Sequence, residues 1–335
     1  MNWLALYERA LGSGESAAGY YNRNVGVLTG EGRVNVRIPL EAADTMDVRV
    51  WREEEVLSCV AAYVGRAPGL RHVSADPRFQ VHHFVEGRVL DGFSPRGSAV
   101  PAHVIGDVVT LMEQLARIPR EKTPPLPADW PESGDGAGFG RRLAALTQLV
   151  YDTHRCEYAA VFEAFGIPAE PLAVVEPRWD TLVSRPFVVL HSDLHRKNMI
   201  VADGVTWFLD WELALWGDPV YELAIHFNKM DYPEEQRAEV LRRWRERLPA
   251  ACTAGPAADL ELYLAHERIK SAIVDTVRYS KQLAGAGPAE RDHLMDRLAR
   301  KLNVARAVWG ESPEMTRDRV ARILAPWVER ESWTP

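Results

Sequence analysis

Short apolar runs separated by turn residues predict a set of small β-strands in the middle of the chain. The runs cover residues 188–190, 199–201 and 207–209. Each run is too short for a helix and is rich in β-branched and aromatic side chains, which favour buried strands. The dipeptide Asp203-Gly204 between the second and third runs is typical of a tight hairpin turn. The pattern therefore predicts a hairpin with one further strand before it.

Alternation dominates towards the N-terminus, and helical spacing dominates most of the remaining chain. Strands are predicted at residues 25–29, 33–38 and 79–85, where apolar and polar side chains alternate. Residues 119–140 have the composition of a linker and predict a surface loop. Apolar residues at helical spacing predict helices over 1–11, 51–64, 104–118, 141–165, 221–229, 233–247, 258–283, 288–309 and 314–330.

Composition and charge narrow the class of protein. A chain of 335 residues with 47% hydrophobic residues can bury a full core, and its length fits two domains or one two-lobed domain. A net charge of −7 argues against a general affinity for nucleic acid, which depends on clustered Lys and Arg. Three separated cysteines without CxxC spacing indicate neither a disulfide framework nor a zinc site.

The sequence also gives no sign of a membrane or export segment. No apolar run approaches the roughly 18 residues of a membrane span. The first residues lack the basic-then-apolar order of a signal peptide. We therefore expect a cytoplasmic protein with no membrane or nucleic-acid partner. The sequence leaves the oligomeric state undetermined.

Polar side chains gather at the ends of the three central strands. His191, Asp193 and Asn198 lie on the loop after the first strand, and the hairpin brings Asp210 back beside them. Magnesium prefers oxygen ligands and commonly takes one or two carboxylates plus phosphate oxygens, so Asn198 and Asp210 would suffice to hold it. Asp193 would then be left to orient a substrate hydroxyl and accept its proton during attack on a terminal phosphate.

The spacing His-x-Asp-x-x-x-x-Asn, followed by a strand and Asp, resembles the catalytic and metal loops of aminoglycoside phosphotransferases and their protein-kinase-like relatives. Gly217-Asp218-Pro219 and Glu222-Leu223-Ala224 resemble the continuation of that motif. The resemblance is sharp over residues 188–224 and spans most of the chain. It implies an α+β, two-lobed protein-kinase-like fold, with a small β-sheet lobe carrying one helix and a larger, mainly helical lobe. The nucleotide-binding lobe would cover residues 1–87, and the catalytic and substrate-binding lobe residues 88–335.

The resemblance also implies roles for the residues of the central loop. Asp193 would be the base or hydroxyl-orienting residue, and Asn198 and Asp210 would hold Mg²⁺. His195 sits where protein kinases place a phosphate-facing Lys, whereas His191 is either functional or only a hydrogen-bonding support of the loop. Two further positions stand out: Ser192 replaces the family's usual Gly, and Asp218 would brace the loop from below.

In the N-terminal lobe, the resemblance implies a nucleotide site. Gly19 and Asn22 match a Gly-x-x-Asn loop that covers the phosphates, and adenine would bond to backbone near His83 to Val85. Arg37 stands in the place of the strand Lys that touches the α- and β-phosphates and pairs with a helix Glu. Glu53 is the preferred partner, with Glu54 and Glu55 as rivals, and Arg49 is an alternative to Arg37.

The resemblance also implies that the acceptor binds against helices of the C-terminal region. Asp231, Glu267 and Asp275 are candidates to meet the amines of an aminoglycoside. Trp216, Tyr221 and Tyr279 could instead form an aromatic cage for a quaternary ammonium group or contact a nucleoside base.

Together these features predict an enzyme that transfers the γ-phosphoryl group of ATP or GTP, with Mg²⁺, to a hydroxyl of a small molecule. The favoured acceptor is an antibiotic of aminoglycoside, peptide or nucleoside type, which would give resistance. The alternatives are a metabolic kinase of choline, ethanolamine, homoserine or a sugar and, from another class, a nucleotide-binding regulator without catalysis.

Overall fold

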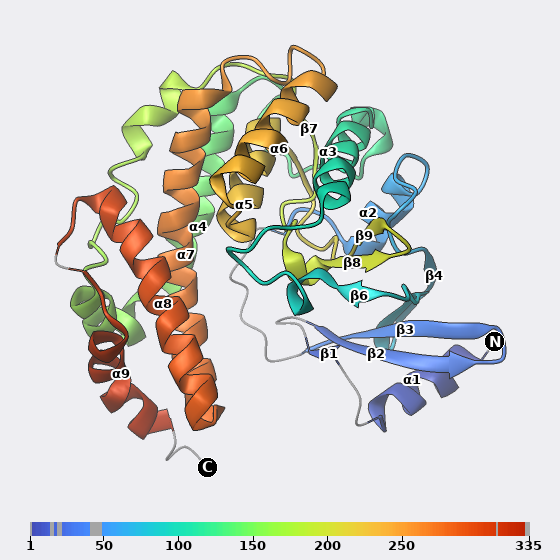
Figure 1. Cartoon of the computed structure of the whole chain (residues 1–335), viewed down its shortest axis with the longest axis horizontal. Coiled ribbons are helices and arrows are strands. Elements are labelled where there is room, and N and C mark those ends of the chain that lie inside the picture. The colour runs from blue at the N-terminus through green and yellow to red at the C-terminus, as the bar shows by residue number, and fades with distance from the viewer. Residues whose placement is uncertain (1, 14–16, 19–21, 41–48, 313, 332–335) are drawn as a thin grey trace.

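The N-terminal part of the chain forms a five-stranded antiparallel sheet. The computed structural model describes residues 2–13, 17–18, 22–40, 49–312 and 314–331. Within the sheet the strand order is β1-β2-β3-β5-β4 (Figure 1). The strands are β1 (Ala17–Ala18), β2 (Asn22–Thr29), β3 (Gly32–Pro39), β4 (Leu70–Ala75) and β5 (Arg78–His83). Strand β4 was not predicted, whereas β2, β3 and β5 confirm the alternating pattern.

Helix α1 (Trp3–Leu11) packs against this sheet. It begins at Asn2, whose side chain accepts a hydrogen bond from the Ala5 N–H at 3.2 Å. Leu6 and Ala10 face the sheet, as helical spacing requires. Their core partners are the alternating strand residues Val25, Val27, Val34, Val36, Ile38, Phe79 and Val81.

Helix α2 (Glu53–Val60) follows the first three strands of the sheet but packs against the C-terminal part of the chain. Its buried residues Val56, Leu57 and Val60 belong to the core of the C-terminal part and not to the core of the sheet. The helix is shorter than predicted because the N–H groups of both Tyr63 and Val64 bond to the carbonyl of Val60, which closes the chain into a turn. Helix α2 therefore ties the two parts of the chain together.

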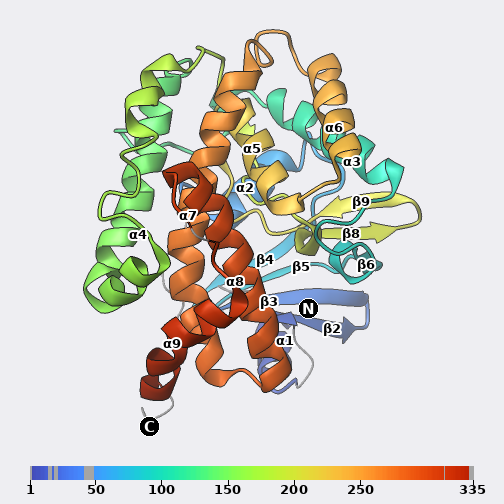
Figure 2. The ribbon, with the colours of Figure 1, turned by 60° about the vertical axis from the view of Figure 1, so that its left-hand side comes forward.

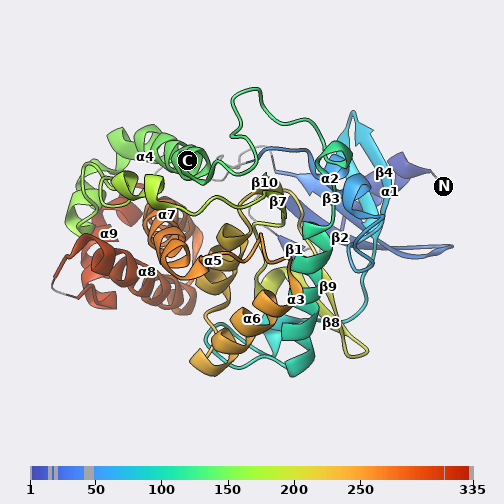
Figure 3. The same ribbon diagram turned by 90° about the horizontal axis from the view of Figure 1, so that it is seen from above.

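Two small sheets carry the central strands. Strands β8 (Met199–Ala202) and β9 (Val205–Phe208) form the predicted hairpin through Asp203-Gly204, whose φ angles are 49° and 74°. A third strand, β6 (Arg88–Val89), pairs with β8. Strand β7 (Val188–Leu190) pairs with β10 (Leu215–Gly217), which was not predicted. Seen from above, β7 and β10 lie between the large sheet and the C-terminal helices (Figure 3).

The rest of the chain is helical, as predicted. Helices α4, α7 and α8 run side by side (Figure 2). Helix α4 begins inside the segment predicted as a loop, because Asp135 accepts a hydrogen bond from the Gly138 N–H at 2.7 Å and caps it. The helices are α3 (Ala102–Ala116), α4 (Gly136–Phe165), α5 (Pro219–Met230), α6 (Glu234–Arg247), α7 (Pro256–Gly285), α8 (Pro288–Trp309) and α9 (Arg317–Glu331), and the 3₁₀ turns are η1 (Leu90–Gly92), η2 (Arg120–Lys122), η3 (Glu176–Thr181) and η4 (Arg196–Asn198).

Within the described ranges, none of the helices combines the length and the apolar character needed to cross a bilayer.

Candidate active site

Arg196 anchors the loop between β7 and β8 to neighbouring backbone segments. The Arg196 guanidinium is buried and donates to three backbone carbonyls, those of Ser94 at 2.8 Å, Ser98 at 2.7 Å and Met230 at 3.1 Å. At the start of the loop, Ser192 adopts a left-handed conformation with φ of 60°. This conformation favours glycine, which explains the residue that the related motif usually carries there.

Asp193 and Asn198 lie side by side on this loop. The Asn198 amide nitrogen donates to the backbone carbonyl of Asp193 at 3.1 Å and to its Oδ2 at 2.9 Å. The other oxygen, Oδ1, forms an ion pair with Lys229. Burial raises the pKa of the Asp193 carboxyl, but the charge of Lys229 outweighs burial and holds that pKa well below its usual range. Asp193 is therefore ionised at neutral pH and ready to accept a hydrogen bond.

One face of α5 holds the loop from the opposite side. Glu222 accepts from the Ser192 N–H at 2.9 Å, the His226 Nδ1 lies 3.0 Å from the Leu194 carbonyl oxygen, and Lys229 pairs with Asp193. These three residues follow the i, i+4, i+7 spacing of a single helix face. Lys229 was not among the residues predicted from the sequence. Its helical register with Glu222 was the one available signal.

The two loop histidines have different surroundings. His191 is fully buried and packs against Trp211 with the rings tilted by 46° and their centroids 4.4 Å apart, and neither ring nitrogen has a hydrogen-bond partner among the described residues. Burial lowers the pKa of His191 to about 4, so the ring is neutral. His195 is partly exposed, and its Nδ1 accepts a hydrogen bond from the Lys197 N–H at 3.2 Å. Burial also lowers the pKa of His195, against the pull of Asp193.

Asp210 lies at the end of the hairpin and reaches the N-terminal sheet through Arg37. Asp210 has a left-handed φ of 64°, and its Oδ1 accepts from Arg37 Nη2 at 2.6 Å. Arg37 Nε pairs with Glu53 Oε2 at 2.8 Å, and Glu53 Oε1 accepts from the Trp211 N–H at 3.1 Å. Burial opposes the charge of Arg37, but Asp210, Glu53 and Glu212 raise its pKa far above the ordinary value. Arg37 is therefore always charged.

The structure shows which glutamate at the start of α2 contacts Arg37, and which partner Arg49 has. Glu54 accepts from the Gln80 amide at 2.9 Å, and Glu55 accepts from the Arg52 N–H at 3.2 Å, so Glu53 is the residue that contacts Arg37. Arg49 is more exposed and pairs with Glu212 at 3.2 Å.

Glu212 is a second site residue that was not predicted from the sequence. It accepts from the Asn22 amide at 2.8 Å and pairs with both Arg37 and Arg49 at 3.2 Å. Burial and Asp210 raise the pKa of Glu212, partly offset by the two arginines. Asn22 thus reaches across to the segment that follows Asp210. Gly19, the other predicted residue of its loop, lies outside the described residues.

The donor set fits a magnesium ion. Met199 pairs with Phe208 in the hairpin register, and the Leu209 N–H donates to the Asn198 carbonyl at 2.8 Å, so Asn198 and Asp210 stand at the same end of the hairpin. The Asn198 amide nitrogen is used by Asp193, which leaves its oxygen end for a cation. Among the described residues there is no group of three or more His, Cys, Asp or Glu that could hold a metal. Phosphate and water oxygens would therefore complete the shell, as is common for Mg²⁺.

His83 and Val85 lie where the large sheet ends and the chain crosses to β6. His83 closes β5, and its N–H donates to the Gly69 carbonyl at 2.8 Å. Val85 is half-buried two residues later. Their contact with adenine stays a prediction.

The three acids predicted to meet an amine-rich acceptor already have cationic partners within the chain. Glu267 is buried and accepts from the Tyr221 hydroxyl at 2.7 Å, with Lys270 at 3.6 Å. Asp275 is buried and pairs with Lys301. Asp231 is exposed at the end of α5, 3.5 Å from Arg96.

The candidate aromatic cage is buried as well. Trp216, Tyr221 and Tyr279 are 7%, 2% and 4% exposed. Tyr221 packs on Phe139 and Tyr263, with ring centroids 5.4 Å apart in both pairs.

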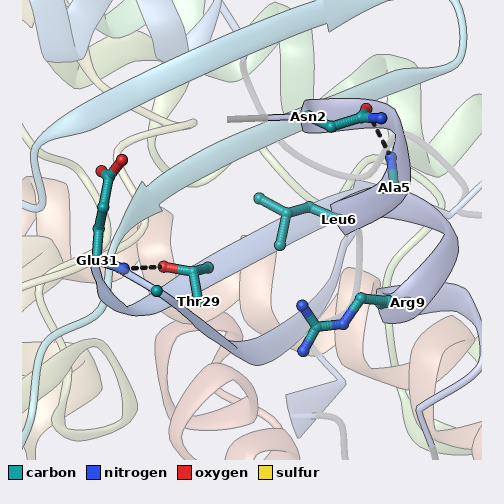
Figure 4. A pocket seen from close by; sticks show the side chains of 7 residues that line it. Asn2, Ala5, Leu6, Arg9, Thr29 and Glu31 are labelled. Carbon is teal, nitrogen blue, oxygen red and sulfur yellow. Dashed lines mark hydrogen bonds between the residues drawn. The ribbon is translucent and has the colours of Figure 1, made fainter.

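A shallow pocket lies elsewhere, at the outer edge of the N-terminal sheet (Figure 4). It is formed where α1 meets the turn between β2 and β3. None of the site residues described above lines it. The residues that do are Asn2, Ala5, Leu6, Arg9, Thr29, Gly30 and Glu31.

This combination of a small antiparallel sheet, a larger helical part and a polar loop between them defines the predicted two-lobed, protein-kinase-like fold, which is confirmed. The model of the phosphotransferase enzyme family matches residues 15–258, nearly three quarters of the 335 residues. The chain belongs to this family and is a phosphotransferase.

Solved structures share the fold at low sequence identity. The macrolide 2'-phosphotransferase MphH from Brachybacterium faecium has a TM-score of 0.56 at 15% identity, covering 94% of this chain and 100% of that chain. The gentamicin complex of APH(2")-IIa has a TM-score of 0.57 at 14% identity, covering 94% and 97%. A choline/ethanolamine kinase family protein from Mesorhizobium loti has a TM-score of 0.53 at 15% identity, covering 94% of each chain. No curated protein matches the sequence.

Proposed function

We propose that this phosphotransferase moves the γ-phosphoryl group of ATP or GTP to a hydroxyl of a small molecule, with an antibiotic as the favoured acceptor and resistance as the outcome. The observation that carries the proposal is the contact of Asp193 with Asn198 on one loop and of Asp210 with Arg37 at the end of the adjoining hairpin. A hydroxyl orienter, a metal site and a phosphate-binding cation are the parts that phosphoryl transfer requires.

The nucleotide would be held mainly by residues 1–87. Arg37 would contact the α- and β-phosphates, because a guanidinium matches phosphate oxygens with paired donors. Gly19 and Asn22 would cover the phosphates, and backbone groups from His83 to Val85 would bond to adenine. Mg²⁺ bound by Asn198 and Asp210 would neutralise phosphate charge. An ADP-bound structure of the aminoglycoside phosphotransferase APH(2'')-Ib, with the same fold, supports a nucleotide donor.

Asp193 would position the acceptor hydroxyl for attack. The bond between that oxygen and the γ-phosphorus forms while the bond from phosphorus to the bridging oxygen breaks. The leaving group, ADP or GDP, keeps the electron pair, and the hydroxyl proton passes to Asp193. The depressed pKa of Asp193 makes it a weak base, so it takes the proton late and acts first by orienting the nucleophile.

The charges near the acceptor side limit the choice of substrate. Because Glu267, Asp275 and Asp231 already pair with cations, an acceptor with few positive charges is favoured over a polycation. The similarity in fold to a macrolide 2'-phosphotransferase supports an antibiotic of this kind.

A metabolic small-molecule kinase is the second candidate, supported by the similar fold of a choline/ethanolamine kinase family protein. Burial of Trp216, Tyr221 and Tyr279 counts against a quaternary ammonium acceptor held in a cage of these rings. Ethanolamine, homoserine and sugars remain as acceptors for this candidate.

An acceptor panel tests the proposal. ADP or GDP release would be measured with aminoglycoside, macrolide, peptide and nucleoside antibiotics and with metabolic alcohols, beside the resistance of bacteria that express the gene. Turnover with an antibiotic supports the proposal, and turnover confined to a metabolite supports the second candidate. Nucleotide binding without release in the presence of any acceptor would instead indicate a regulator.

The first variant to examine is Asp193→Asn. We expect kcat to fall about 1000-fold, as for loss of a positioned general base, while calorimetry still detects nucleotide binding. Asp203→Asn changes an exposed Asp on the β8–β9 turn in the same way and serves as the control. A wild-type rate for Asp193→Asn would remove Asp193 from the mechanism.

A further inference from the structure

Lys229 presents a positive charge at the reacting end of the site. Its Nζ pairs with Asp193 Oδ1, and its side chain keeps 26% of its surface exposed. The side chain reaches the loop from α5, whose Glu222 and His226 contact the loop residues on either side of Asp193. Its position is therefore fixed by the packing of a whole helix and not by the loop alone.

The loop residue that lies beside Asp193 is His195, whose Nε2 is 3.5 Å from Asp193 Oδ1. His195 stands where protein kinases place a phosphate-facing Lys, but its Nδ1 accepts a hydrogen bond from the Lys197 N–H, so this nitrogen carries no proton and the ring is neutral. Arg37 is held by Glu53, Asp210 and Glu212 on the side of the metal residues. A phosphoryl group in transfer spreads negative charge over three oxygens and is stabilised by a fixed cation.

The distances that in-line phosphoryl transfer requires place the γ-phosphoryl group near Lys229. A hydroxyl that donates to Asp193 lies about 3 Å from the carboxylate, and in-line attack requires the phosphorus about 3–3.5 Å from the hydroxyl oxygen. Lys229 contacts the same carboxylate. These contacts limit the separation between the phosphorus and Lys229 Nζ to roughly 9 Å, and rotation of the Lys229 side chain lets its three ammonium donors approach the phosphoryl oxygens.

We propose that Lys229 is a catalytic residue that contacts the γ-phosphoryl group of the bound nucleotide and stabilises it during transfer. This role rests on the proposed function. The proton of the acceptor hydroxyl passes to Asp193. Helix α5 thus supplies a cation beside Asp193, where the loop carries the neutral His195.

Nucleotide binding tests the contact without any acceptor. Calorimetry with Mg²⁺ would compare ADP with the β,γ-imido analogue of ATP, which retains the γ-phosphoryl group. We expect Lys229→Met to weaken binding of the analogue about tenfold more than binding of ADP, and Lys229→Arg to restore the difference. Lys122→Met, an exposed change in η2, is the control. Equal effects on both nucleotides would reduce Lys229 to a structural support and overturn the proposal.

Turnover tests the second half of the proposal. Turnover would be measured with water or with an acceptor that is phosphorylated in the panel. Lys229→Met should lower kcat about 100-fold, with a smaller change in KM for the acceptor. Lys229→Arg should recover most of the rate. Unchanged kcat in Lys229→Met would overturn the catalytic role. If the analogue-specific loss is seen but wild-type protein transfers phosphate to no acceptor, Lys229 is correctly placed and the proposed function is what fails.

Discussion

At the scale of single residues, two left-handed non-glycine residues fix the site. Ser192 and Asp210 have φ angles of 60° and 64°, a region that L side chains rarely adopt. Each helps to orient a carboxylate of the site. Ser192 directly precedes Asp193, and Asp210 turns its own carboxylate towards Arg37. Strained backbone of this kind persists where the surroundings hold it in place. Here Glu222 holds Ser192, and Glu53 holds the backbone after Asp210.

Ser192 provides a test of that strain. Its hydroxyl is buried without a hydrogen-bond partner among the described residues. Ser192→Ala and Ser192→Gly both remove the hydroxyl, but only glycine also removes the Cβ that disfavours the left-handed region. We expect Ser192→Gly to exceed Ser192→Ala in free energy of unfolding by about 1 kcal/mol, measured by urea denaturation. Equal stability of the two variants would mean that the backbone at Ser192 is unstrained.

Glu222 makes stability depend on pH. Burial raises its pKa from 4.5 to about 7, although the N–H groups of Ser192 and His191 and the charge of Lys229 oppose this. The folded state therefore holds a proton that the unfolded state loses near pH 4.5, so the contribution of Glu222 to stability is full below that pH and is lost as pH rises to about 7.

Replacing Glu222 by Gln should flatten this dependence. We expect the fall in unfolding free energy from pH 5 to pH 8 to shrink by about 2 kcal/mol in Glu222→Gln. Urea unfolding at both pH values measures the difference. Glu235→Gln on the exposed side of α6 should keep the wild-type slope. A slope in Glu222→Gln as steep as in wild type would assign the dependence to other groups.

At the scale of elements, α5 organises the site. Its N-terminus is set by Asp218, whose carboxylate accepts from the Val220 N–H at 2.9 Å, and by Pro219 at the first helical position. Arg185 bonds to both oxygens of Asp218, at 3.0 and 2.9 Å, and also pairs with Asp259. The opposite end of the same helix carries Lys229. The buried ion pairs therefore set the register with which α5 meets the loop between β7 and β8.

Removal of Asp218 should be costly. Asp218→Ala leaves Arg185 with less compensation and deletes the cap of α5, so we expect a loss of about 3–5 kcal/mol in unfolding free energy. Asp180→Ala breaks an exposed pair with Arg141 and should cost at most about 1 kcal/mol. Chemical denaturation of both variants gives the comparison. Similar small losses would show that the Arg185 network is dispensable for folding.

At the scale of the whole molecule, the two lobes are joined through polar contacts of Arg37 and Asn22 with the segment after the β8–β9 hairpin. Helix α2 packs its apolar side into the core of the large lobe while Glu53 at its start holds Arg37 of the sheet. Arg37 and Asn22 then reach Asp210 and Glu212 on the other lobe. A nucleotide bound beside Arg37 would therefore replace part of an existing link between the lobes.

Arg37→Met tests this link. We expect the affinity for Mg²⁺-ATP to fall at least about tenfold, because a charge-assisted contact to phosphate is lost. Calorimetry measures the affinity, and Arg78→Met on the exposed end of β5 is the control. An unchanged affinity in Arg37→Met would place the phosphates elsewhere.

Much of the fold and part of the site could be predicted because the signals are local. Asp203-Gly204 sets the β8–β9 turn, and the fixed spacing from Asp193 to Asn198 brings the two side chains together within one loop. The resemblance to a known motif led further, to the contact between Arg37 and Glu53. Strands β4, β6 and β10 were missed because their short runs lack a distinctive pattern and are stabilised by pairing with distant segments.

The sequence by itself determined the order of most helices, the β8–β9 hairpin and the loop from Asp193 to Asn198, because hydrophobic periodicity, turn chemistry and short spacings act between neighbours along the chain. Only the tertiary structure decided that Lys229 meets Asp193, that Glu212 binds Asn22 and Arg37, and that Glu267 and Asp275 are already neutralised. These pairs form when helices and lobes pack. Which side of a helix meets which partner depends on the whole arrangement, which local patterns do not specify.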